Sequence, residues 1–333
     1  MSAEPELRIL LLRLSSLGDI VLTQPLIHAL RTRYPEARID LVVRKEYADV
    51  MRGVIELTNL LELDLTKRNA LVELRSQLAV TKYTHVLDLH NNYRTKRLRL
   101  LRGAKVRAIY KRSFQRWLLV KFKINALKDA PDVIGRYFEV AKVLGLTDDG
   151  SAPQFRNNAT REPRLVAIAP GSKHWNKRWP TQYFIELIGK LIIEGWKVEL
   201  FGSVEDKPLA LEIAENVDSD HVKSFAGDLT IAESMERMAR ASLAITNDSG
   251  LMHVASALGV PTIAIFGPTV REFGFMPRAK TATILENTGL YCRPCTAIGK
   301  DYCPDKHFKC MKDITPGQIL ISVEGISVEG MKK

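Results

Sequence analysis

The sequence lacks any apolar run near the roughly 20 residues that a membrane-spanning helix needs. Its first residues, MSAEPELR, carry acids before the first apolar run and show neither the basic start nor the small-residue cleavage site of a secretory signal. We therefore expect a cytoplasmic protein. With 46% hydrophobic and 26% charged residues, the chain has the composition of an ordinary globular protein.

Cysteine is absent from the first 291 residues and then occurs four times, as Cys292, Cys295, Cys303 and Cys310. A cytoplasmic location argues against a disulfide framework. Four thiolates in one loop could close a tetrahedral zinc site, with His307 as a competing ligand. Only the first pair has the C-x2-C spacing of a zinc knuckle, so free or partly paired thiols are the favoured alternative.

Acidic residues are missing from residues 92–128, which contain 13 lysines and arginines. The net charge of the whole chain is +11, so this segment accounts for the entire excess. It should attract an anion, which could be a phosphorylated lipid surface, an acidic sugar or nucleic acid. Phe114, Trp117 and Phe122 make a membrane-surface helix possible over residues 112–123, with a merely solvated face as the alternative. The sequence shows no DNA- or RNA-binding module, so we expect no nucleic-acid partner.

The G-x-G-x-x-G fingerprint is also absent, which weakens a reading as an NAD enzyme. What the chain does contain is an alternation of short apolar runs and amphipathic stretches, typical of parallel α/β sheets. At 333 residues it is long enough for two domains. Residues 145–163 are rich in Pro, Gly, Asn and Asp and form the best linker candidate. Strands are predicted at residues 8–13, 38–43, 83–89, 165–169, 197–201, 243–246 and 262–266, and helices at residues 20–34, 181–194, 205–216 and 250–258.

This pattern predicts an α/β protein with two doubly wound, Rossmann-like domains, residues 1–150 and 164–333, facing a central cleft. Ligands of such sheets bind outside the carboxyl ends of the strands. Three motifs occupy such positions. The first, residues 15–19 (SSLGD), turns the first strand into a helix, and its Asp19 has two readings: a helix cap or a functional carboxylate. Arg13 nearby could keep Asp19 ionised.

The second motif, residues 170–180, is a cationic loop containing Ser172, Lys177 and Arg178. Such a loop suits a phosphate or carboxylate, although a solvated basic loop is the more common meaning. Trp175 and Trp179 could stack on a ligand ring or simply pack in the protein.

The third motif, residues 246–253 (TNDSGLMH), leads a strand into a helix. Free N–H groups and the macrodipole at such a helix start form an anion site. Asp248 or Ser249 could instead merely cap the helix, and His253 reads as a buried, satisfied histidine. Thr230 and Glu233 have capping-box spacing, which competes with a role for Glu233 in ribose binding.

Taken together and in this order, five strings resemble the lipopolysaccharide heptosyltransferases of glycosyltransferase family 9, which have the GT-B fold. The strings are residues 8–35 (RILLLRLSSLGDIVLTQPLIHALRTRYP), 88–98 (DLHNNYRTKRL), 169–180 (APGSKHWNKRWP), 245–269 (ITNDSGLMHVASALGVPTIAIFGPT) and the cysteine-rich stretch from CRPC to residue 316.

The resemblance implies an inverting enzyme that moves heptose from ADP-heptose to the lipid A–Kdo–heptose inner core, without a metal or other cofactor, at the inner face of the cytoplasmic membrane. It implies a peripheral membrane location, with the acceptor on the N-terminal domain and the nucleotide sugar on the C-terminal domain. Asp19 would be the general base and Lys177 would stabilise the departing diphosphate. The implied nucleotide-sugar residues are Ser172, Lys177, Glu233, Asp248, Ser249, Gly250, Leu251 and His253. The implied acceptor residues are Ser16, Gly18, Asn91 and Arg94.

Two alternatives stay open from the sequence. A family relative could transfer another sugar from another nucleotide. A non-catalytic anion-binding protein could use the basic segment alone.

Overall fold

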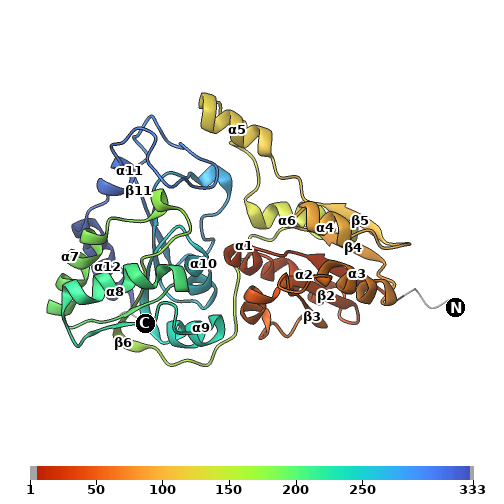
Figure 1. The fold of residues 1–333 in the computed structure, drawn as a ribbon, viewed down its shortest axis with the longest axis horizontal. Helices are drawn as coiled ribbons and strands as arrows, with labels where there is room; N and C mark the ends of the chain where they lie inside the picture. The colour runs from red at the N-terminus through yellow and green to blue at the C-terminus, as the bar shows by residue number, and fades with distance from the viewer. Residues whose placement is uncertain (1–5, 331–333) are drawn as a thin grey trace. The chain divides into compact units, whose positions relative to one another are not determined.

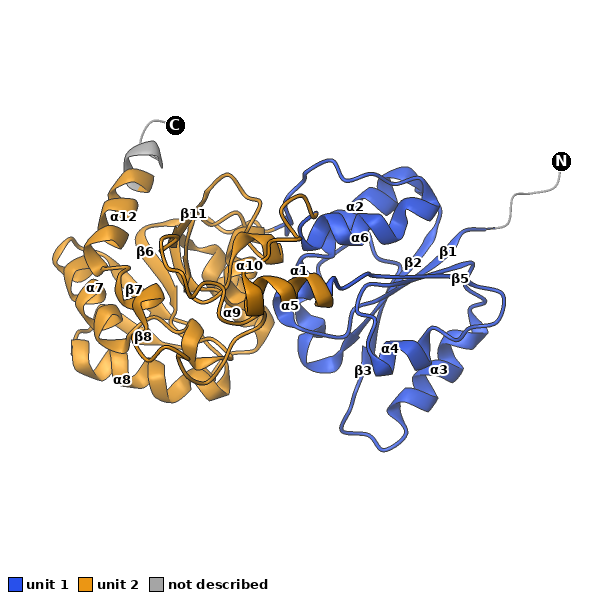
Figure 2. Cartoon of the chain, turned by 90° about the horizontal axis from the view of Figure 1, so that it is seen from above, with its two compact units in different colours: residues 1–112, 131–156 blue, residues 113–130, 157–333 orange. Residues whose placement is uncertain are grey.

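Each half of the chain forms a parallel sheet with helices packed against it, because apolar strands alternate with amphipathic helices along the sequence. The computed structural model describes residues 6–330. The chain divides into two compact units (Figure 2): unit 1 is Met1–Arg112 with Pro131–Arg156, and unit 2 is Ser113–Ala130 with Asn157–Lys333.

The sheet of unit 1 has the strand order β3-β2-β1-β4-β5, and all its pairs are parallel. Its central strand has the sequence RILLL, of which the four apolar residues are buried, as expected for a strand covered on both faces. The strands are β1 (Arg8–Leu12), β2 (Arg38–Arg44), β3 (Asn59–Leu63), β4 (His85–Asp88) and β5 (Lys105–Ala108), and the helices are α1 (Leu17–Val21), α2 (Gln24–Arg33), η1 (Lys45–Met51), α3 (Ala70–Val80), α4 (Tyr93–Leu98), α6 (Val133–Ala141) and η2 (Lys142–Leu144).

The sheet of unit 2 has the order β11-β10-β9-β6-β7-β8 and is also entirely parallel. Figure 1 labels its first and last strands, β6 and β11. Its strands are β6 (Glu162–Ala169), β7 (Lys197–Leu200), β8 (Val222–Ser224), β9 (Ala241–Asn247), β10 (Thr262–Phe266) and β11 (Ala282–Glu286). Its helices are α5 (Ser113–Phe122), η3 (Trp175–Lys177), α7 (Thr181–Ile193), η4 (Val204–Asp206), α8 (Lys207–Val217), α9 (Ile231–Ala239), α10 (Gly250–Ala257), η5 (Arg271–Phe273), α11 (Lys309–Lys312) and α12 (Pro316–Gly330).

Both sheets have the strand order of a Rossmann fold, in which the chain returns to the middle of the sheet to add its fourth strand beside its first. Consequently each sheet has one switch point, between β1 and β4 in unit 1 and between β6 and β9 in unit 2.

The division of the chain differs from the expected one in one segment. The later boundary, between Arg156 and Asn157, falls inside the expected linker. Residues 113–130, however, leave the first half and fold with unit 2. The reason is apolar burial, because Leu119 and Leu127 of this segment form a small core with Phe273.

The helix predicted over residues 20–34 is instead two helices, α1 and α2, joined at Leu22 and Thr23. Pro25 explains the break, because proline has no N–H for a helical hydrogen bond and fits only the first turn of a helix. It lies at the start of α2.

One core of unit 2 contains Trp179 and Phe184, which pack against β6, β7 and β9. Ring centroids of these two side chains are 4.9 Å apart in an edge-to-face arrangement, which suits aromatic pairs. Within residues 6–330, no helix combines the length and apolarity that crossing a bilayer requires.

We predict that Phe184→Ala lowers the free energy of unfolding of unit 2 by about 3–5 kcal/mol, the usual cost of emptying a buried aromatic site. Phe184 is fully buried in α7, whereas Ile193 ends the same helix with 86% of its surface exposed. The matched control Ile193→Ala should therefore change stability little. Urea unfolding followed by tryptophan fluorescence measures both, and equal stabilities would contradict this account of the core.

Candidate active site

The sequence motifs lie at the switch points of the two sheets. Asp19 follows β1, and residues 89–94 follow its neighbour β4. In unit 2, residues 170–178 follow β6 and residues 248–251 follow its neighbour β9. In doubly wound sheets these loops border the crevice in which ligands bind.

Asp19 sits in a short helix directly after β1 and is held by a buried cation. Arg13 Nη2 lies 2.6 Å from Asp19 Oδ1, and Asp19 Oδ2 accepts hydrogen bonds from the backbone N–H and hydroxyl of Ser16, at 3.2 and 2.7 Å. Burial alone would raise the pKa of Asp19, but the Arg13 charge and the Ser16 hydrogen bonds outweigh it and lower that pKa. The carboxylate is therefore ionised at neutral pH.

The helix-cap reading of Asp19 is confirmed, and its reading as a functional carboxylate stays a prediction. Ser16 is the N-cap residue of α1, and Asp19 completes its capping box. The second carboxylate oxygen faces Arg13, which agrees with the expectation that Arg13 keeps Asp19 charged. Gly18, between them, is buried in the first turn.

The loop after β4 is organised by Asp88. Its Oδ1 accepts hydrogen bonds from the backbone N–H groups of His90 and Asn91, at 3.1 and 2.6 Å. The Asn91 side-chain amide donates at 3.0 Å to the carbonyl of Ile109, the residue that follows β5, so this amide is already engaged. His90 Nδ1 accepts the backbone N–H of Leu14, which ties this loop to the one that carries Asp19.

His90 is neutral in this setting, because burial and the nearby Arg13 charge lower its pKa to about 3. Arg94 is exposed on α4, with its charge close enough to contribute to the same shift. Burial and the Arg13 charge also lower the pKa of Lys111, which lies within electrostatic range of Asp19 and Asp88. The switch point of unit 1 thus combines the carboxylates of Asp19 and Asp88 with several cations.

In unit 2, Gly171 follows the end of β6. A Cβ atom there would lie 2.2 Å from the carboxylate of Asp206, so any other residue would force that side chain to move. Arg178 Nε donates to the carbonyl of Ser172 at 2.8 Å, which fixes the cationic loop beside this glycine. Ser172 is buried and donates its hydroxyl to the carbonyl of Asp248 at 3.3 Å, joining the loops after β6 and β9.

Lys177 and Asp248 form the central ion pair of this switch point. Lys177 Nζ lies 2.7 Å from Asp248 Oδ2, which also accepts the hydroxyl of Thr269 at 2.7 Å. Burial would raise the pKa of Asp248, but the Lys177 charge and the two hydrogen bonds lower it. Asp248 is therefore an ionised residue that positions Lys177.

The helix α10 begins immediately after this pair. Ser249 is its N-cap residue, yet its side chain makes no capping hydrogen bond, and Asp248 is committed to Lys177 and Thr269. The alternative that Asp248 or Ser249 merely caps the helix is therefore wrong. The N–H groups of Gly250 and Leu251 begin the helix at a point where an anion would complete the first turn. His253 is buried, as expected.

Glu233 completes the capping box expected from its spacing to Thr230, at the start of α9. Its Oε2 accepts hydrogen bonds from the backbone N–H and the hydroxyl of Thr230, at 2.7 and 2.8 Å.

The two tryptophans of the cationic loop pack within the protein. Trp179 is a core residue whose Nε1 donates to the carbonyl of Ile314, so it packs rather than stacks on a ligand. Trp175 is partly exposed and stacks on Phe308.

Comparison with known proteins decides the family. The model of glycosyltransferase family 9 (heptosyltransferase) matches residues 71–304, well over half of the chain. The chain belongs to glycosyltransferase family 9. The predictions of family and of glycosyltransferase activity from the sequence are thereby confirmed.

Relatives of this glycosyltransferase match over nearly the full length. Lipopolysaccharide heptosyltransferase 2 of Escherichia coli (strain K12) is 24% identical over 350 residues, covering 97% of this chain and 99% of the relative. The solved structure of E. coli ADP-heptose LPS heptosyltransferase II has 23% identity and a TM-score of 0.77, covering 98% of this chain and all of that one. A family 9 glycosyltransferase structure from Veillonella parvula DSM 2008 has 23% identity and a TM-score of 0.78, with 99% and 100% coverage. The predicted fold class, GT-B with two doubly wound Rossmann-like units, is confirmed.

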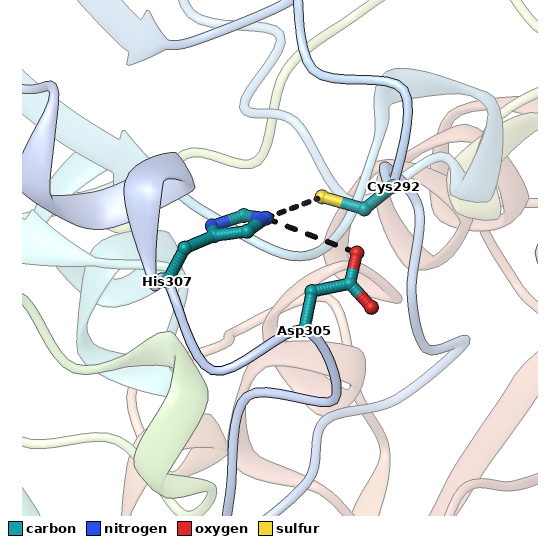
Figure 3. A group of neighbouring side chains, drawn as sticks. All are labelled: Cys292, Asp305 and His307. Carbon is teal, nitrogen blue, oxygen red and sulfur yellow. Dashed lines mark hydrogen bonds and ion pairs between the residues drawn. The ribbon is translucent and has the colours of Figure 1, made fainter.

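The cysteine-rich loop of this glycosyltransferase contains four free thiols. Cys292, Asp305 and His307 place their ligand atoms within 4.8 Å of one another, and these three residues could hold a metal ion (Figure 3). His307 Nε2 faces both Cys292 Sγ, at 3.7 Å, and Asp305 Oδ2, at 3.8 Å. His307 Nδ1, however, accepts the backbone N–H of Lys309, which places the ring proton of a neutral histidine on Nε2. Metal-binding histidines usually donate from the second nitrogen, so this geometry favours a hydrogen-bonded cluster.

Sequence reasoning missed four residues of the two switch points. His90 and Asp88 lie in the string DLHNNYR, Lys111 follows β5, and Thr269 follows β10. The sequence marked these residues only by their position after a strand. That position does not predict the hydrogen bond from Thr269 to Asp248, which lies 21 residues earlier in the chain.

We predict that Lys177→Met lowers the free energy of unfolding by about 3–5 kcal/mol, because it leaves the buried Asp248 charge unpaired. The double variant Lys177→Met/Asp248→Asn should recover most of this loss, since the amide is uncharged and can still accept from Thr269. Lys190→Met provides the control, because its ion pair with Glu186 in α7 is exposed and should contribute about 1 kcal/mol or less. Urea unfolding measures the stability of all three variants. A double variant less stable than Lys177→Met would contradict the ion pair between Lys177 and Asp248.

Proposed function

We propose that this glycosyltransferase transfers heptose from ADP-heptose to the lipid A–Kdo–heptose inner core of lipopolysaccharide, with inversion at the anomeric carbon. The names of its full-length relatives support the donor and the acceptor. The structural observation that carries the proposal is the site after β6 and β9, where Lys177 lies beside the open start of α10.

The donor diphosphate suits unit 2. Sugar transfer builds negative charge on the departing diphosphate, and fixed positive groups aimed at that charge lower the barrier most. Lys177 supplies a full charge, and the N–H groups of Gly250 and Leu251 supply the helix dipole. In this proposal Asp248 holds the Lys177 ammonium in place until the diphosphate arrives.

Further residues of unit 2 would contact the rest of the donor. Glu233 uses Oε2 for the helix cap and keeps Oε1 for a ribose hydroxyl. Ser172 and Ser249 lie in the loops after β6 and β9, and His253 is buried in the following helix α10. We assign them to nucleotide-sugar binding.

Asp19 in unit 1 would act as the general base for the acceptor hydroxyl. Its lowered pKa makes it a weak base, although one that is always ionised. A weak base can still take the proton, because the hydroxyl becomes strongly acidic as its oxygen bonds to the anomeric carbon. Arg13 then has a definite role: it fixes the carboxylate and its charge state.

The acceptor would lie over the loops after β1 and β4. Ser16 and Gly18 border Asp19, and Asn91 and Arg94 belong to the second loop. The exposed Arg94 and neighbouring cations suit a phosphorylated, anionic core. We therefore propose unit 1 as the acceptor-binding part, unit 2 with its residues 113–130 as the donor-binding part, and a peripheral location on the cytoplasmic face of the inner membrane.

No metal is required in this mechanism, because the chain itself supplies the cations that face the diphosphate. Inverting transfer from a nucleotide sugar also needs only one carboxylate, as the base, whereas glycoside hydrolases use two catalytic carboxyl groups.

Asp19→Asn should reduce kcat by at least about 100-fold, because base catalysis contributes roughly 10²–10⁴ to such steps. The Kd for ADP-heptose should stay within about threefold, since the donor lies on unit 2. Glu73→Gln is the control, as it removes an exposed carboxylate from α3. Calorimetry measures the Kd for ADP-heptose, and single-turnover assays measure the rate of transfer. If Asp19→Asn weakened donor binding as much as it slowed transfer, Asp19 would not be the general base.

With a purified, truncated lipopolysaccharide core, ADP-heptose should support transfer in the presence of EDTA, and UDP- and dTDP-sugars should not. Mass spectrometry of the acceptor and release of ADP measure the outcome. Transfer from another donor would replace the proposed sugar while leaving the fold and site intact. Loss of transfer with EDTA, restored by a divalent ion, would show that a metal is needed.

A further inference from the structure

Helix α5 presents a cluster of large aromatic side chains to solvent. Phe114, Trp117 and Phe122 are 64%, 50% and 54% exposed. They contact one another: Phe114 and Trp117 stack with centroids 5.8 Å apart, and Trp117 meets Phe122 edge-on at 5.2 Å. Scattered exposed apolar residues are normal, but a contiguous cluster marks an interaction surface.

The opposite face of α5 is anchored to unit 2. Leu119 packs with Phe273 in a small core, and Arg116 donates to the carbonyl of Ala297 at 2.6 Å. Just beyond the helix, Lys123 Nζ donates to the carbonyls of Cys292 and Pro294, at 2.9 and 2.7 Å. These bonds hold α5 against the cysteine-rich loop, so the aromatic face cannot turn inward without breaking them.

The segment that carries this face is basic. No aspartate or glutamate occurs in residues 92–128, although Asp129 follows it and Glu272 accepts a hydrogen bond from Asn125 at 2.9 Å. Lys121 is exposed on α5, and Lys128 is exposed further along the segment. Exposed aromatic rings on a basic segment match the interfacial zone of an anionic bilayer, where amphipathic rings lie at the headgroups and lysines meet phosphates.

We propose that α5 docks this glycosyltransferase on an anionic phospholipid bilayer, with Phe114, Trp117 and Phe122 entering the interface and Lys121 and Lys128 contacting headgroup phosphates. The inference deepens the membrane location proposed above by naming the surface. It also gives the segment 113–130 a purpose: the donor-binding unit, rather than the acceptor-binding one, would carry the attachment.

The test uses the full chain and vesicles of phosphatidylcholine with or without phosphatidylglycerol. Cosedimentation should show binding that needs the anionic lipid and weakens with salt. The variant Phe114→Ser/Trp117→Ser/Phe122→Ser should lose at least tenfold in partitioning. A matched control, Ile193→Ser/Val204→Ser/Ile321→Ser, removes three exposed apolar residues elsewhere on unit 2 and should bind like the wild type.

Trp117 supplies a second readout. The fluorescence of Trp117 is the difference between the emission of the wild type and that of Trp117→Phe. Iodide should quench this fluorescence in solution, and the quenching should decrease when anionic vesicles are added. Shielding before vesicles are present would overturn the proposal, because the face would then be covered by another part of the chain or by a second copy. Equal vesicle binding by the aromatic variant and its control would overturn it as well. A parallel binding assay with an oligonucleotide would also overturn it if the aromatic variant lost oligonucleotide binding and kept vesicle binding.

Transfer to a detergent-dispersed acceptor separates this inference from the proposed function. If the aromatic variant keeps that transfer but loses vesicle binding, the docking role is supported. If the wild type transfers heptose but ignores vesicles, docking fails and the function stands.

Discussion

The candidate site of each unit of this glycosyltransferase centres on a largely buried carboxylate that is paired with one cation. In unit 1 the pair is Asp19 with Arg13, and in unit 2 it is Asp248 with Lys177. A buried charge is tolerated only when it is paired and hydrogen-bonded, so each pair fixes the loops around it. Ser16, Thr269 and Ser172 complete these two networks, and the residues proposed for chemistry take their positions from them.

The two pairs differ in what they leave available. Arg13 is buried and donates to the carbonyl of Leu89, so it serves the fold as well as the Asp19 carboxylate. Lys177 approaches Asp248 from the end of the short helix η3, next to a helix start that carries no side-chain cap. Unit 1 therefore presents a fixed carboxylate, and unit 2 presents a cation and free N–H groups. That contrast fits the proposed roles, a base in unit 1 and a leaving-group site in unit 2.

Much of the framework followed from periodicity. The apolar strands β1, β2, β6, β9 and β10 and the helices α7 and α10 lie within a few residues of their predicted positions. Elements with weak apolar patterns were not predicted, among them the edge strands β3, β5 and β8, because edge strands are half exposed. The break at Pro25 and the placement of residues 113–130 in unit 2 were also missed.

The sequence by itself determined the α/β class, the family and the motifs at strand ends, because local patterning and motif order are properties of consecutive residues. Only the tertiary structure decided which side chains meet. Asp248 joins Lys177 across 71 positions, and Lys123 joins the loop at Cys292 across 169. Such pairings depend on strand order and loop closure, so no window of sequence contains them.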